Sequence, residues 1–309
     1  MFISREFKRT LVYNVVKISA LLLNTLPRSA ALFFGAVLGN MVYVFSRRDR
    51  LKAQRNAYLA FGRELSQNQL KTLARKCFIN MGKMAVDVIR IRRHYDDELR
   101  NLIDIEGLEN LDPVYNKGHG VIVPTGHIGN FELLAVHFAR MGYKVGVIGR
   151  RLYDPRFDEL IRTGREQMGM KVFDTRQSPR EMMRWLKDGG MLGVLMDTDS
   201  FRVRSMFIPV FGRLSHTPVG QSILALRTDT PVVPIICLRN GSRYKIKVWP
   251  EIKIERTENF EHDVYNLTKE CTRIWEKIVK ENKDQWIWIH NRWHNRPEQP
   301  ITYIEETIS

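Results

Sequence analysis

Two side chains capable of acid–base chemistry, His127 and Glu132, lie in the stretch 121–135, which reads V-I-V-P-T-G-H-I-G-N-F-E-L-L-A. If the chain turns at His127, the imidazole can fold back over a following helix, where Glu132 could hydrogen-bond one ring nitrogen. The other nitrogen could then take a proton from a hydroxyl, which is how an alcohol nucleophile is activated. The alternative is an ordinary loop histidine, because this spacing also occurs by chance.

The elements around the two residues favour the chemical interpretation. The apolar run 121–123 predicts a short buried strand, and Pro124, Gly126 and Gly129 end it. Residues 131–140 predict a helix with Asn130 as its N-cap. This places His127 in the strand–helix turn and Glu132 in the first helical turn, where backbone N–H groups could also stabilise an oxyanion or a phosphate.

Strands and helices alternate through the rest of the chain, which predicts an α/β fold with a mixed, mostly parallel sheet and helices on both faces. Further strands are expected at 103–107, 144–148, 171–173, 191–196 and 232–238, with an edge strand at 244–254. Helices are expected to open at Asp154-Pro155, Ser178-Pro179 and Thr217-Pro218, and to cover 262–280.

Active sites of such sheets lie at the carboxyl ends of the strands. His127, Arg150 and Asp197 each come just after an expected strand. We therefore expect these three polar residues to converge in one crevice.

Residues 1–48 contain two apolar runs in a basic setting, 11–26 and 30–45, separated by Leu26-Pro27-Arg28. Neither reaches the roughly 20 uninterrupted apolar residues of a transmembrane helix. We expect a membrane-associating helical segment, either one tilted span or a monotopic hairpin with cytoplasmic basic flanks; packing of both helices on the catalytic domain is the alternative. Residues 49–309 are expected to form a single domain with a helical lead-in at 49–100.

The composition excludes several classes of protein. Lys+Arg 49 against Asp+Glu 34 gives a net charge of +15, which indicates an anionic partner. No zinc-ligand spacing or nucleic-acid motif is present, so neither a metal site nor a nucleic-acid partner is expected. Cys77, Cys237 and Cys271 show no pairing pattern, which fits a reducing compartment.

Four blocks of the sequence together resemble a known family. P-T-G-H-I-G-N-F-E (124–132) resembles the H-x₄-[DE] motif of glycerolipid-type acyltransferases, in the form found in the late acyltransferases of lipid A biosynthesis. G-V-L-M-D-T-D (193–199), P-V-F-G-R-L-S-H-T-P-V-G (209–220) and D-Q-W-I-W-I-H-N-R-W (284–293) are similar to further blocks of that family. Thr198 stands where glutamine is usual, so that position is assigned no role.

The resemblance implies a glycerolipid acyltransferase-like fold and an O-acyltransferase on the cytoplasmic face of the inner membrane. The acyl donor would be a thioester of acyl carrier protein or coenzyme A, the acceptor an anionic glycolipid, and no further cofactor would be needed. His127 would be the base and Glu132 would orient it. Arg165 would bind a substrate phosphate or an oxyanion, and weaker substrate-binding assignments fall on Asn130, Arg150, Asp197 and Arg213.

Other interpretations remain open at this point. The mannoside acyltransferases share the same blocks, and a lysophospholipid acceptor is a further possibility. A thioesterase could use the same base with water, although no G-x-S-x-G elbow is present, and a non-enzymatic binding protein would use His127 and Glu132 only to cap a turn. Residues Trp286, Trp288 and Trp293 are expected as core anchors, and His290 and His294 as structural.

Overall fold

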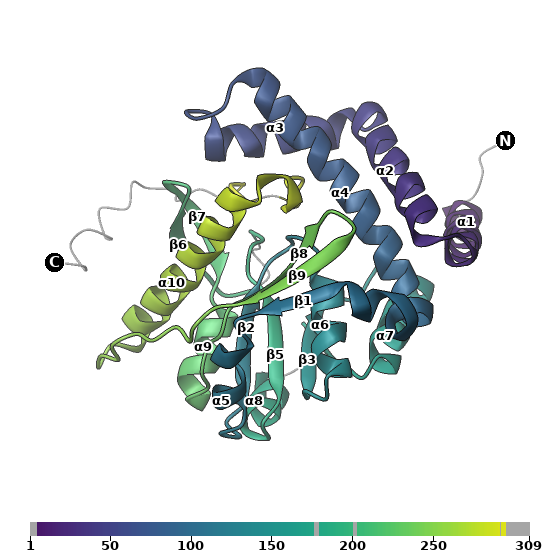
Figure 1. Ribbon diagram of the computed structural model, residues 1–309. Helices are drawn as coiled ribbons and strands as arrows, with labels where there is room; N and C mark the ends of the chain where they lie inside the picture. The colour runs from purple at the N-terminus through teal and green to yellow at the C-terminus, as the bar shows by residue number, and fades with distance from the viewer. Residues whose placement is uncertain (1–4, 176–178, 200–202, 291, 295–309) are drawn as a thin grey trace.

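The computed structural model describes residues 5–175, 179–199, 203–290 and 292–294 (Figure 1). The helices are α1 (Arg5–Thr25), α2 (Arg28–Phe45), α3 (Arg47–Phe61), α4 (Gln67–His94), α5 (Asp112–Tyr115), α6 (Phe131–Arg140), α7 (Pro155–Gln167), α8 (Pro179–Lys187), α9 (Gly220–Thr228) and α10 (Phe260–Glu281). Short helical turns are η1 (Tyr95–Leu99), η2 (Arg100–Leu102), η3 (Leu108–Asn110) and η4 (Lys283–Gln285).

The strands are β1 (Ile103–Glu106), β2 (Val121–Thr125), β3 (Val145–Gly149), β4 (Lys171–Asp174), β5 (Met191–Leu195), β6 (Ser205–Val210), β7 (Arg213–Pro218), β8 (Ile235–Asn240) and β9 (Arg243–Val248). One sheet is parallel, in the order β2-β5-β3-β4. A second, mixed sheet has the order β1-β9-β8. An isolated parallel bridge pairs Ile122 of β2 with Val232, which lies in the segment leading into β8. The expected α/β architecture is confirmed.

Helices cover both faces of the sheet because neighbouring residues of β2 point into different cores. Val121 and Val123 pack in a cluster with Leu133 and Leu134 of α6. Ile122, between them, packs in a second cluster with residues of α8, α9 and α10. A strand buried on both faces reads as a continuous apolar run, which is the pattern that 121–123 shows.

Two sequence predictions are wrong, one of a helix start and one of an edge strand. Thr217 and Pro218 do not open a helix: they end β7 of the hairpin β6–β7, and α9 begins at Gly220. Proline has no N–H to donate to a sheet, but this hairpin has only two strands, so Pro218 does not interrupt the hydrogen bonds of a central strand. The strand at 244–248 is not an edge strand, because β9 lies between β1 and β8.

The N-terminal prediction of two apolar helices broken at Leu26-Pro27 is confirmed by α1 and α2. The expected helical lead-in is confirmed by α3 and α4, and Ser66 is the N-cap of α4. The Ser66 side chain accepts from the backbone N–H of Gln69, whose side chain accepts in return, forming a capping box. The expected helix start at Ser178 lies partly outside the described residues, which resume at Pro179.

Candidate active site

The turn between β2 and α6 requires glycine at two positions. Gly129 has φ +60°, and a Cβ there would lie 2.0 Å from the carbonyl oxygen of Cys237. A Cβ at Gly126 would lie 2.6 Å from Trp275 Nε1 and 3.0 Å from the carboxyl carbon of Asp197. Larger residues would therefore push the turn away from the neighbouring strand ends and from Asp197.

His127 is held by Asp197 at the carboxyl ends of two adjacent strands. Nδ1 of His127 lies 2.8 Å from Asp197 Oδ1, and the His127 backbone N–H donates to Oδ2 at 2.8 Å. β2 and β5 pair in parallel, so residues two positions beyond each strand end meet. Trp286 Nε1 also donates to Asp197 Oδ2, at 2.8 Å, and the carboxylate is fully buried. This carboxylate therefore fixes both the ring and the backbone of His127.

The electrostatics of the pair favour an ionised Asp197. Burial alone raises the pKa of Asp197, but the charge of His127, its hydrogen bond and the N–H of Trp286 bring that pKa well below its usual value. Burial lowers the pKa of His127, while the charge and hydrogen bond of Asp197, together with the charge of Glu132, outweigh it and raise that pKa above 6.5. His127 is thus a stronger base than a free imidazole.

A second histidine packs on the first. The rings of His127 and His290 have centroids 4.3 Å apart and planes at 52°. His290 Nε2 is buried and, within the described part of the chain, has no hydrogen-bond partner. Burial and the charge of His127 lower the pKa of His290 to about 4, so this ring is neutral at physiological pH.

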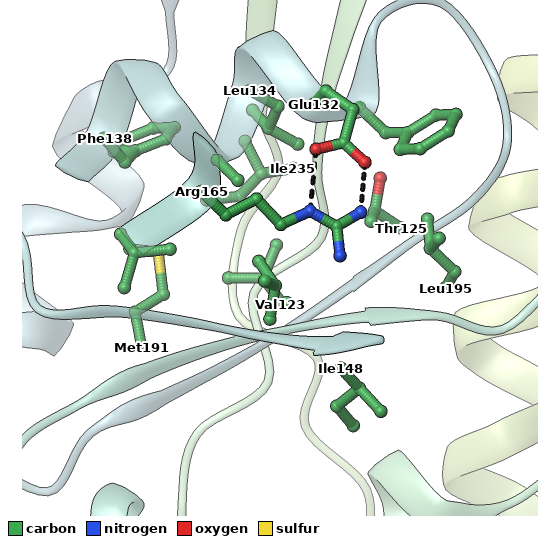
Figure 2. Close-up of a pocket in the computed structure, with 15 residues that line it drawn as sticks. Val123, Thr125, Glu132, Leu134, Phe138, Ile148, Arg165, Met191, Leu195 and Ile235 are labelled. Carbon is green, nitrogen blue, oxygen red and sulfur yellow. Dashed lines mark hydrogen bonds and ion pairs between the residues drawn. The ribbon is translucent and has the colours of Figure 1, made fainter. Parts of the chain in front are cut away.

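The hydrogen bond expected between Glu132 and His127 is not the one observed. Glu132 instead forms an ion pair with Arg165, whose Nε donates to Oε2 and whose Nη2 donates to Oε1 (Figure 2). The distance from Nε to Oε2 is 3.1 Å. Each of the two side chains is about one-fifth exposed. Glu132 acts on His127 through its charge alone, because Asp197 occupies Nδ1.

The Glu132–Arg165 pair sits at an apolar pocket between α6 and the parallel sheet. The cavity inside it has a volume of about 50 Å³. Its walls are almost entirely apolar and include Val123, Leu134, Phe138, Ile148, Met191 and Leu195 (Figure 2). Thr125 contributes the hydroxyl nearest the ion pair in Figure 2, and that oxygen has no hydrogen-bond partner among the described residues.

The remaining residues that the sequence suggested for substrate binding make other contacts or are exposed. Asn130 is the expected N-cap, accepting from Leu133 N at 3.0 Å, and its amide donates to Tyr244 while the residue is fully buried. Arg150 follows β3 as expected but is exposed, with no hydrogen bond or ion pair to His127, Asp197 or Glu132. Arg213 is exposed at the start of β7 and donates to the carbonyl of Leu59.

From the sequence we expected Trp286 to be a core anchor and His290 to be structural, and both also contact the His127–Asp197 pair. The backbone of 285–287 runs beside the turn: Gly129 N donates to Gln285 O at 3.1 Å, and Ile287 N donates to His127 O at 3.0 Å. The only signal was the density of aromatic and histidine residues at 284–293. Trp286 is also fully buried, as a core anchor should be.

Within the described ranges, no group of three or more His, Cys, Asp or Glu side chains is arranged to hold a metal ion. The centre instead joins a buried carboxylate, an imidazole and an apolar pocket. This set of groups suits proton transfer beside an apolar substrate, which is the class of site that an acyltransferase of apolar chains needs.

Comparison with known proteins identifies that class. Residues 4–295 match the model of the family described as bacterial lipid A biosynthesis acyltransferase, and the chain belongs to this family. It is 25% identical over 280 residues to the lipid A biosynthesis palmitoleoyltransferase of Escherichia coli (strain K12), covering 88% of this chain and 87% of the relative. The lauroyltransferase of the same strain is 24% identical over 276 residues, covering 88% of each.

A phosphatidylinositol mannoside acyltransferase of Mycobacterium tuberculosis (strain CDC 1551 / Oshkosh) is also similar. It is 20% identical over 218 residues, covering 69% of this chain and 67% of the relative. The similarity therefore extends to acyltransferases named for a different glycolipid.

Proposed function

We propose that this protein transfers a fatty acyl chain from a thioester to a hydroxyl group of a lipid A precursor or related glycolipid. The observation that carries the proposal is the hydrogen bond between His127 Nδ1 and the buried Asp197, beside a pocket lined with apolar side chains. Family membership and the names of the relatives supply the reaction class and the acceptor class.

His127 is the general base. With Nδ1–H donating to Asp197, Nε2 carries a lone pair and accepts the proton of the acceptor hydroxyl. The alkoxide oxygen attacks the thioester carbonyl carbon, and the carbonyl becomes a tetrahedral oxyanion. When it collapses, the C–O bond is retained and the C–S bond breaks, and the thiolate takes the proton from Nε2. Asp197 keeps the tautomer and stabilises the imidazolium that forms in between.

The pocket is assigned to the acyl chain, because burial of methylene groups is favourable by about 0.8 kcal/mol each. Glu132 and Arg165 lie where the chain would meet the polar ends of the substrates. Glu132 holds Arg165 in place and adds negative charge near His127, while Arg165 is poised to exchange this contact for a substrate phosphate or the oxyanion.

The partners follow from charge and substrate. The donor is acyl carrier protein or coenzyme A, and the net charge of +15 suits either an acidic carrier or the phosphates of coenzyme A. The acceptor is an anionic lipid, so the enzyme works at a membrane surface, which we assign to the cytoplasmic face of the inner membrane. The apolar residues exposed on α1 and α2 support a membrane-bound location.

The proposal is tested by acyl transfer from acyl carrier protein to a tetra-acylated lipid A precursor. His127→Ala should lose about 10²–10⁴-fold in rate, the usual contribution of a general base. His119→Ala is the matched control, because His119 is an exposed histidine at the opposite end of β2. Full activity of folded His127→Ala protein would refute the assignment.

The similarity to a mannoside acyltransferase favours one second candidate, a different polar-lipid acceptor. A panel of acceptors with the same donor separates the two, because transfer to a mannoside or lysophospholipid in the absence of transfer to the lipid A precursor would replace the acceptor and keep the reaction. Release of free fatty acid at the same rate with and without acceptor would instead indicate a thioesterase.

A further inference from the structure

α2 is the one helix of the described chain that is long and apolar enough to cross a bilayer. Its 18 residues span about 27 Å, close to the thickness of the hydrocarbon core. Such a helix can cross the membrane or lie along one surface of it. The elements that α2 packs against distinguish these two arrangements.

The inner face of α2 packs closely against α4 (Figure 1). Gly35 and Gly39 form a G-x-x-x-G motif, which lets helix backbones approach closely. A Cβ at Gly39 would lie 2.2 Å from the carbonyl oxygen of Phe78, and a Cβ at Gly82 would lie 2.0 Å from that of Gly35. The motif is therefore used within the chain, against α4.

Polar contacts fix both ends of this helix pair. At the start of α2, the Arg28 guanidinium donates to both oxygens of the buried Asp87, at 2.8 and 2.9 Å. Towards the other end, Arg75 Nε donates to Asn40 Oδ1 at 2.7 Å. The contacts run along almost the whole of α2, so α2 and α4 are placed as one unit.

The other side of α4 belongs to the catalytic domain. Cys77 Sγ donates to the carbonyl of Trp286 at 3.0 Å, and Asn80 donates to the carbonyl of Asp284 at 2.9 Å. The same Asp87 that pairs with Arg28 accepts from the Tyr244 hydroxyl at 2.6 Å. α4 is thus enclosed between α2 and the domain that carries His127.

If α2 crossed the bilayer, α4 would be drawn to the same depth. α4 carries the exposed charged residues Lys71, Arg75 and Lys76, and it packs against η4 and α6 of the catalytic domain. Charged side chains and irregular backbone are costly in hydrocarbon. The observed packing is therefore incompatible with α2 as a span.

The outward face of α2 is suited to lipid. Six large apolar side chains recur at helical spacing on this face, and each is between 41 and 78% exposed. They are Phe33, Phe34, Val37, Leu38, Met41 and Phe45. The exposed Arg47 and Arg48 follow directly at the start of α3, where they can meet anionic headgroups. The apolar face and its basic border are complementary to one leaflet of an anionic bilayer.

We infer that α2 lies in the plane of a single leaflet, with its outward face in the acyl chains and both its ends on the side of the catalytic domain. The protein is then monotopic at this helix. The inference depends on the packing of α2 and α4 and not on the reaction, so it stands or falls independently of the proposed function.

Single cysteines at the two ends of α2 test it. Ser29→Cys and Arg47→Cys mark the ends, Leu38→Cys marks the middle, and Lys117→Cys marks the catalytic domain; all four positions are exposed. The native Cys77, Cys237 and Cys271 are buried, so the wild-type protein gives the background. The full-length protein is placed in sealed phosphatidylethanolamine–phosphatidylglycerol vesicles with the catalytic domain outside, and a membrane-impermeant maleimide is added.

A monotopic helix predicts that Ser29→Cys and Arg47→Cys react as completely as Lys117→Cys in intact vesicles. Leu38→Cys should react at least tenfold more slowly until detergent is added. Labelling of either end only after permeabilisation would overturn the inference, and so would equal reactivity of Leu38→Cys and Arg47→Cys in intact vesicles. Complete labelling of each variant in detergent establishes that every thiol is reactive in the folded protein.

Discussion

Two carboxylates flank the turn that carries His127, and their surroundings differ. Asp197 is fully buried and accepts from the ring and backbone of His127 and from Trp286. Glu132 is partly exposed at the pocket mouth and pairs with Arg165. The carboxylate five residues from the histidine in sequence therefore does not orient it, and the one that does is 70 residues away.

This contrast separates two tasks. A carboxylate that positions a base must hold one geometry, which burial and three hydrogen bonds ensure for Asp197. A carboxylate that shares a substrate site must be able to release its partner, and a partly solvated ion pair costs little to break. Replacing each one should therefore change different kinetic constants.

Asp197→Asn should have the largest effect of the substitutions at these two carboxylates. An amide can present its NH₂ group to Nδ1 and so stabilise the wrong tautomer, which removes the free lone pair of Nε2. We expect kcat to fall about 10²–10⁴-fold, close to the loss in His127→Ala. Steady-state kinetics with a far-ultraviolet circular dichroism check would measure it, and a loss confined to KM would contradict the positioning role.

Glu132→Gln and Arg165→Leu should cost less, about 10–10²-fold in kcat/KM, since each removes charge-assisted contacts to substrate and leaves the His127–Asp197 pair intact. Because the two side chains are partners, the double variant should lose less than the product of the single losses. The exposed pair Arg140–Asp96 offers a matched control, and its removal should be nearly silent. Strict additivity of Glu132→Gln and Arg165→Leu would argue against a shared task.

The smallest expected effect is a shift of the acidic limb of the pH–rate profile in Glu132→Gln. His127 must be neutral to act as base, and its pKa is raised above 6.5, so activity falls as the pH drops through that raised value. Glu132→Gln removes one negative charge and lowers the pKa of His127, which shifts the limb to lower pH. A shift to higher pH in kcat/KM would contradict this sign.

The sequence predicted the parts of the fold that local pattern controls. The apolar runs predicted β2 and β5. Active sites of such sheets lie at the carboxyl ends of the strands, and this correctly predicted that His127 and Asp197 lie together. The pattern did not reveal the strand order, so it gave no reason to prefer Asp197 over the nearby Glu132. Arg150 follows a strand too, yet it is exposed, because a strand end fixes the position of a residue along the sheet and not the direction of a loop side chain.

One wrong prediction and one set of contacts that the sequence did not reveal have a common physical origin. Thr217-Pro218 resembles a helix start, because proline is favoured at the first helical position, but the pairing of β7 with β6 decided its structure. Trp286 is the buried core anchor that the sequence predicted, and His290 was expected to be structural. Their contact with His127 and Asp197 was not predicted, because it depends on the backbone of 285–287 lying beside the turn. Both are tertiary pairings between distant segments, which local propensity does not encode.

The most direct test of the account is the Nδ1 proton of His127, observed by nuclear magnetic resonance in protein labelled with ¹⁵N-histidine and assigned by its loss in His127→Ala. A proton held between Nδ1 and a buried carboxylate exchanges slowly and resonates far downfield. We predict that this resonance persists in Glu132→Gln and is lost or moved strongly upfield in Asp197→Asn. Its loss in Glu132→Gln and survival in Asp197→Asn would show that Glu132 orients the base after all.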